Sequence, residues 1–176
     1  MSDVIAVKCR GFKICRRQTK KVLKTLRERA PWEFPAGWLS IAFTDDATTC
    51  ELHERFLDDP SKTDVITFPG DDVFTIPKRR ETTRKTLAGS IADDESAFAG
   101  EIVVCVPQAL RAAAQFGTTP ADEILLYLVH GWLHLAGLDD LADDTRRQMR
   151  AAESEALEIL RSAGAAPLTR ITFPEL

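Results

Sequence analysis

Apolar residues change their spacing several times along this chain, and each change predicts where a strand gives way to a helix. Short runs rich in β-branched and aromatic residues predict four strands, at 4–9, 38–43, 63–68 and 100–106. Helical spacing predicts five helices: about 15–30, a short one after a cap at Thr48 or Thr49, 107–117, 119–137 and 145–161. This order predicts an α+β, or mixed α/β, fold in which a small four-stranded sheet has about five helices against it.

The segment 119–137 carries the clearest helix signals in the chain. Thr119 suits the N-cap, Pro120 suits the first helical position, and Gly137 suits the residue just beyond the helix end. Its residues are apolar almost all round, which is typical of a helix buried on most sides. We therefore predict that this helix is the central element of the core.

One long polar segment interrupts the pattern. Residues 70–99 show no sustained period and contain a basic run at 77–85, so we predict a flexible insertion there. No other change of composition marks a domain boundary, and 176 residues are enough to bury one core. We expect residues 1–176 to form a single domain.

Composition favours a cytoplasmic protein. The longest apolar run, 124–129, is far shorter than the ~20 residues that span a bilayer, and the N-terminus lacks a signal-peptide layout. The cysteines at positions 9, 15, 50 and 105 show no CxxC spacing. We expect buried thiols in a reducing compartment rather than disulfides or a cysteine-bound zinc.

The net charge of −4 gives no overall signal for nucleic acid, but the positive charge is concentrated in two stretches. The first is the predicted helix 15–30, which includes Arg16, Lys20 and Lys24, and the second is the run 77–85. Each stretch suits contact with a phosphate backbone, and each equally suits a solvated surface.

Two of the three histidines, His130 and His134, stand four residues apart on the helix 119–137. That spacing puts their Cβ atoms about 5–6 Å apart on one face, so both imidazoles can bind one metal ion. Gly131 occupies the place of the glutamate in the HExxH motif of zinc proteases, which argues against a protease of that type, and it lets another element approach the helix closely. The alternative is a pair of hydrogen-bonded core histidines. His53 is expected to be partly exposed or to line the same cleft.

The residues after this helix offer a third ligand. Gly137 can adopt the left-handed conformation that ends a helix and turns the chain back, which would bring Asp139 or Asp140 over the imidazoles. Two histidines and one carboxylate form a recognised zinc site with a position open for water. Alternatively, the two aspartates cap the segment that follows.

The motif from His130 to Asp140 resembles the signature HGxLHLxGYDH of the YbeY family, which comprises bacterial rRNA maturation factors and single-strand endoribonucleases. Three further segments resemble family segments in the same order. They are ELHERFLDDPSKTDVITFP (ELNxxYRxxDxPTDVLSFP in the family), GEIVVC (GDIVIC) and MRAAE (MxxxE). The resemblance covers roughly residues 40–160.

The resemblance implies a zinc-dependent enzyme that cleaves phosphodiester bonds in single-stranded RNA, acting on rRNA of the small ribosomal subunit. It implies His130, His134 and Asp140 as the ligands. We also expect His130 to be catalytic, and the chain reversal keeps Asp139 as the reserve candidate for the third ligand. Asp140 stands where the family has a third histidine, and an anionic ligand makes the ion a milder Lewis acid.

A second departure affects catalysis. The family's arginine in the YR dipeptide corresponds to Leu57 here. Arg55 is the nearest candidate for its role, but two helical residues point about 200° apart, so Arg55 can replace it only if the helix has ended. Lys62 is another candidate.

These departures leave three hypotheses. The first is a metal-dependent endoribonuclease of ribosome maturation whose activity is weakened by Leu57. The second is a ribosome-assembly or RNA-binding factor that keeps the metal site but has little nuclease activity. The third is a metal-dependent hydrolase of another substrate, which the acidic net charge favours.

Overall fold

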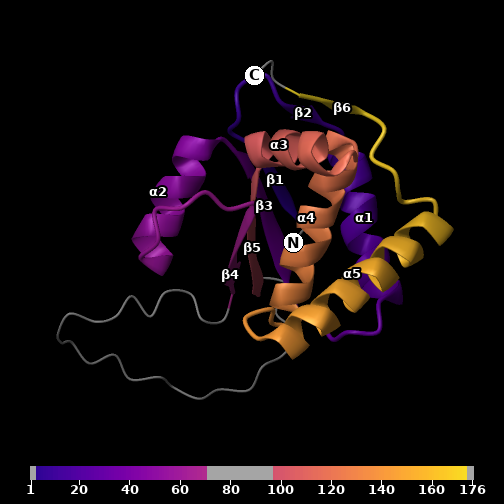
Figure 1. The fold of residues 1–176 in the computed structure, drawn as a ribbon. Coiled ribbons are helices and arrows are strands. Elements are labelled where there is room, and N and C mark those ends of the chain that lie inside the picture. The colour runs from indigo at the N-terminus through magenta and orange to yellow at the C-terminus, as the bar shows by residue number, and fades with distance from the viewer. Residues whose placement is uncertain (1–2, 71–96, 174–176) are drawn as a thin grey trace.

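The computed structural model describes residues 3–70 and 97–173 of the chain. The strands are β1 (Val4–Val7), β2 (Lys13–Ile14), β3 (Trp38–Thr44), β4 (Val65–Pro69), β5 (Phe98–Cys105) and β6 (Ile171–Thr172). The helices are α1 (Arg16–Arg29), α2 (Asp46–Leu57), α3 (Val106–Phe116), α4 (Pro120–Leu135) and α5 (Asp143–Ser162). Figure 1 shows their arrangement.

The main sheet has four strands in the order β1-β3-β5-β4. β1 pairs in parallel with β3 and β3 with β5, whereas the edge strand β4 runs antiparallel to β5. Parallel pairs need long crossover connections, and α1 supplies one of these between β1 and β3. The described residues thus form the expected mixed α/β fold with a four-stranded sheet.

The two faces of this sheet are covered unequally. Apolar residues of one face, such as Ile41 and Val104, belong to the large core that also includes buried residues of α1, α3, α4 and α5. The other face carries a small cluster of Ala42, Ile66 and Val103, with Leu52 of α2 packed against it. α2 therefore lies across the sheet from α4 and α5 (Figure 1), and its first residue, Asp46, pairs with Arg111 of α3.

Helix α4 is the central helix, as its sequence predicts. The Thr119 hydroxyl caps it by accepting the backbone N–H of Asp122. It packs against α3, α5, β4 and β5. Trp132, fully buried at its centre, stacks on the ring of Phe34 at 4.7 Å. Because other helices and strands pack against α4 on most of its sides, almost the whole helix is apolar.

Gly131 allows α4 to lie unusually close to the sheet. A Cβ atom on Gly131 would come within 2.7 Å of Cγ2 of Ile102 on β5 and within 3.2 Å of Val65 on β4. The element that the sequence predicts to approach the helix here is therefore the sheet itself. This contact fixes how far the histidine-bearing turns of α4 stand from β4.

Two local features differ from the sequence-based expectations. Asp45, rather than Thr48 or Thr49, caps α2, because its carboxylate accepts the Thr48 N–H at 2.9 Å. The short sheet of β2 and β6 was not expected, because strands of two residues leave no periodic pattern.

The expected insertion at 70–99 lies mostly outside the described residues, as does the basic run 77–85. Phe98 and Ala99 at its end belong to β5. All four cysteines are free thiols; Cys9 and Cys105 are buried, whereas Cys15 and Cys50 are half-buried. Among the described residues, no helix combines the length and apolar character needed to span a bilayer.

Replacing Gly131 by alanine should destabilise the protein. Overpacking typically costs about 1–3 kcal/mol, and the better helix propensity of alanine returns up to ~1 kcal/mol, so we expect a net loss of about 1–2 kcal/mol in unfolding free energy. Urea denaturation measures it. In an Ile102→Ala background, which lacks the clashing methyl group, Gly131→Ala should cost less; an equal cost in both backgrounds would contradict this explanation.

Candidate metal centre

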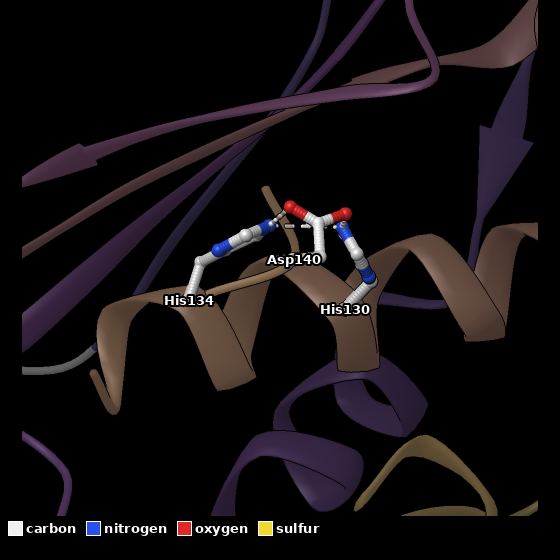
Figure 2. Close-up of side chains that lie close together, drawn as sticks. All are labelled: His130, His134 and Asp140. Carbon is white, nitrogen blue, oxygen red and sulfur yellow. Dashed lines mark hydrogen bonds and ion pairs between the residues drawn. The ribbon is translucent and has the colours of Figure 1, made fainter. Parts of the chain in front are cut away.

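His130 and His134 project from the same face of α4, one turn apart, with their imidazoles toward each other (Figure 2). Their Nε2 atoms are 2.9 Å apart, and the ring planes are nearly perpendicular at 88°. Both side chains are largely buried, with exposed fractions of 17% and 25%. Two ring nitrogens so close together need a cation, either a proton or a metal ion, between their lone pairs.

The second nitrogen of each ring determines which tautomer is present. His134 Nδ1 lies 3.0 Å from the Leu138 carbonyl oxygen, which can only accept, so Nδ1 carries the proton. His130 Nδ1 lies 2.6 Å from Oε1 of Glu153 on α5 and donates to that carboxylate. In their neutral forms, both imidazoles therefore present unprotonated Nε2 atoms to the same point, as metal-binding histidines with supporting partners do.

The turn that ends α4 positions the third group. Gly137 has φ +92°, the left-handed conformation that glycine adopts readily. The Leu138 N–H bonds to the Leu133 carbonyl and the Gly137 N–H to the His134 carbonyl, which is the Schellman pattern. The chain then runs back over the helix and brings Asp140 above the imidazoles (Figure 2).

Asp140, rather than Asp139, joins the two histidines. Its oxygens each lie 3.7 Å from one Nε2, Oδ2 facing His130 and Oδ1 facing His134. One ligand atom from each of the three residues lies within 4.8 Å of the others. The Asp139 carboxylate instead accepts the N–H groups of Asp140 and Leu141 and so stabilises the turn.

The environment of His130 has opposing effects on its pKa. Burial disfavours the charged ring and lowers the pKa, but the hydrogen bond and charge of Glu153, with the charges of Asp64 and Asp140, raise it. The net result is a raised pKa. Carboxylates around this ring therefore favour a positive charge at the site, which a bound cation would supply equally well.

The donor set fits a divalent ion. Two neutral imidazoles and one carboxylate are ligands that zinc binds in catalytic sites, with a fourth position left for water. Oxygen-only ligation, which magnesium and calcium prefer, is excluded by the two nitrogens. The ring nitrogens and the carboxylate already converge without rearrangement of the backbone.

A cavity of about 180 Å³ lies beside this group. His130 and Asp140 contribute to its wall. The remaining wall comes from the residue before β4, from α4 and from α5: Asp64, Leu126, Tyr127, Arg146, Met149, Arg150 and Glu153. Burial raises the pKa of Tyr127, with the charges of Asp64 and Glu123 adding to the effect.

The other residues singled out from the sequence lie elsewhere. Arg55 is exposed on α2, with its guanidinium 5.3 Å from the ring centre of Phe56. Lys62 is paired with Asp46 at 3.3 Å, and the half-buried ring of His53 bonds to the Ser61 carbonyl. Leu57 is 58% exposed at the end of α2. None of these four residues lines the cavity beside His130.

Sequence reasoning missed the supporting residues. Glu153 stood within the MRAAE segment, but its contact with His130 depends on α5 packing across α4. Arg146 and Arg150 were not singled out, since a helical pattern does not reveal which exposed positions border a cavity. The basic side chains of α1, which suit either a phosphate backbone or a solvated surface, are not in the cavity wall.

The family model and the curated relatives that match this chain point to the same protein family. Residues 8–161 match the family model described as Endoribonuclease YbeY. Among curated relatives, Endoribonuclease YbeY of Acidothermus cellulolyticus is 37% identical over 128 residues, covering 73% of each chain. The same-named protein of Mycolicibacterium gilvum is 36% identical over 124 residues, which cover 70% of this chain and 64% of that protein.

A solved structure shares the fold. The solution structure of TM1509 from Thermotoga maritima aligns with a TM-score of 0.52 and 22% identity, covering 94% of this chain and 95% of that one. Identity at this level supports a common fold and nothing finer.

We predict that Glu153→Gln weakens metal binding. A neutral amide cannot offset the burial of His130, so in metal-free protein the pKa of this histidine should fall, which NMR titration measures. At neutral pH the loss of the supporting carboxylate should reduce zinc affinity about 10–100-fold. In the wild type, affinity should decline on acidification already at the raised pKa, whereas in Glu153→Gln this decline should begin at lower pH. Glu155→Gln, an exposed change on the same helix, should alter neither quantity.

Proposed function

We propose that this chain, which belongs to the endoribonuclease YbeY family, is a metal-dependent endoribonuclease that hydrolyses single-stranded RNA. The family name supports the reaction, and the convergence of His130, His134 and Asp140 supports a divalent ion as cofactor. We propose zinc as that ion. The substrate would be rRNA of the small ribosomal subunit during its maturation in the cytoplasm.

One observation carries the proposal for the metal. The Nε2 atoms of His130 and His134 are 2.9 Å apart, while both Nδ1 atoms donate to other groups. A hydrogen-bonded core pair would place a proton of one ring on the lone pair of the other, but here both Nδ1 protons are used elsewhere. A shared cation accounts for the geometry without charging either imidazole.

The chain's own residues divide the work at the site. A divalent ion held there would supply Lewis acidity, which polarises a phosphoryl oxygen and acidifies a water molecule. Glu153 orients His130, and the Leu138 carbonyl orients His134. Asp140 adds a negative charge that lowers the net charge of the centre. The cavity beside His130 gives a flexible RNA backbone access to the site.

A second candidate function is RNA binding in ribosome assembly with little turnover. The exposed apolar side chain of Leu57 favours it, because the family's arginine corresponds to this position in the sequence resemblance. Arg55 remains a proposed substitute. Both Arg55 and Leu57 lie within α2, so their side chains point in different directions from that helix.

The first test is metal analysis followed by cleavage of a labelled single-stranded RNA. We expect about one zinc per chain and cleavage that a chelator abolishes and added zinc restores. His130→Ala should lose both the bound metal and the cleavage. His53→Ala, a histidine change outside the group, should lose neither. A full equivalent of zinc in His130→Ala would refute the assigned site.

The second test concerns Leu57. Loss of one preorganised electrostatic donor typically costs about 10²–10³ in rate, so wild-type cleavage should be slow and Leu57→Arg should raise kcat. Because Leu57 is exposed, unfolding free energy should change by no more than ~0.5 kcal/mol. Fast wild-type cleavage that Arg55→Ala abolishes would show instead that Arg55 already replaces the missing group.

A further inference from the structure

Two arginines of α5 enter the wall of the cavity beside the histidine pair. Arg146, Arg150 and Glu153 follow one another at helical spacings of four and three residues, so they form one stripe along α5. The stripe ends at Glu153, whose carboxylate holds His130. Both arginines therefore line the same small space as the candidate ligands His130 and Asp140.

Arg150 is not engaged by neighbouring side chains. Its guanidinium has no ion pair or hydrogen bond with any residue of the described ranges 3–70 and 97–173. Arg146, by contrast, pairs with Asp143 at 3.0 Å and donates to the Leu141 carbonyl. Arg150 is thus the cation of the cavity wall that remains available for a ligand.

The charges of the wall set a condition on that ligand. The lining residues include three carboxylates, of Asp64, Asp140 and Glu153, and two arginines, so these five side chains together carry one net negative charge. A divalent cation on the histidine pair would reverse this to one net positive charge. An anion is therefore favoured in the cavity only when the metal is bound.

The cavity volume bears on which part of an RNA strand can lie beside the metal site. Its volume of about 180 Å³ is several times the ~30 Å³ that one water molecule occupies in the liquid, yet it is below the ~300 Å³ at which pockets for drug-sized ligands begin. This space is sufficient for a phosphate group. Guanidinium groups bind phosphate oxygens with a matching planar geometry.

We propose that Arg150, with Arg146 as the secondary group, binds a backbone phosphate of the RNA beside the His130–His134–Asp140 group. This assignment rests on the proposed function. Arg150 on α5 would provide a cationic group at the site, whereas Leu57 on α2, which corresponds to the family's arginine, provides none. Arg150 contacts the substrate, and its contribution to binding requires the bound metal.

The test measures binding of zinc-loaded protein to a fluorescent 2′-O-methyl single-stranded oligoribonucleotide over a range of salt concentrations, with gels to confirm that the strand stays intact. Arg150→Ala should lower the affinity and reduce the magnitude of the slope of log K against log salt by about 0.7, the value for one phosphate contact on a single strand. Arg150→Lys should keep the slope while losing part of the affinity. Arg147→Ala removes an exposed arginine of α5 that does not line the cavity and should leave both unchanged.

Metal removal provides an independent arm. After chelation, wild type and Arg150→Ala should bind the oligonucleotide alike, because the cavity wall then carries no net positive charge. Equal affinities of wild type and Arg150→Ala with zinc bound would overturn the proposal, as would an equal loss in Arg147→Ala. Zinc content is measured for each variant. If Arg150→Ala loses the metal, Arg150→Lys becomes the deciding variant for the phosphate contact. A reduced salt slope in Arg150→Lys would contradict the assignment.

The outcome is distinguishable from failure of the proposed function. If zinc-loaded protein binds RNA through Arg150 but never cleaves it, the proposed nuclease function is refuted and the proposed phosphate contact is retained. If cleavage depends on zinc but neither binding nor kcat/KM is affected by Arg150→Ala, the nuclease function is retained and the phosphate contact is refuted.

Discussion

The site depends on one electrostatic constraint, namely that two imidazole nitrogens 2.9 Å apart cannot both present lone pairs without a positive charge between them. The constraint persists because the other side of each ring is fixed. The Leu138 carbonyl holds one Nδ1 proton and the Glu153 carboxylate holds the other. Neither ring can turn away without leaving a largely buried donor unsatisfied, which typically costs about 1–3 kcal/mol. The protein therefore keeps the pair ready for a cation.

Helix α4 contributes both to the hydrophobic core and to the candidate metal site. Its buried sides belong to the core through residues such as Trp132, while one narrow strip carries the two histidines, of which His130 lines the cavity. Gly131 lies between the two histidines and brings the helix against β4 and β5. That closeness also places Asp64, just before β4, at the cavity wall. The packing of the sheet and the composition of the site are thus linked through a residue that has no side chain.

The fold and the central helix could be predicted because their signals are local. Thr119 at the helix start, Gly137 at its exit and the histidine spacing each act within a few residues, and the structure places all of them as expected. The role of Glu153 and the position of Arg150 depend on how α5 crosses α4, which no periodicity in either helix encodes. The choice between Asp139 and Asp140 likewise depended on the path of the turn. The proposed metal, substrate and roles of Arg55 and Leu57 rest on chemistry that the fold alone does not determine.

The turn at Gly137 has a consequence for how the chain folds. All three candidate ligands lie between His130 and Asp140, so the loop that joins them is short and the entropy lost on closing it is small. A single helix with its exit turn can thus assemble the ion-binding group before the long-range pairing of β1, β3 and β5 is complete. An ion that also binds such a partly folded chain stabilises it together with the native state. The gain in native stability from the metal is then smaller than its affinity alone would give.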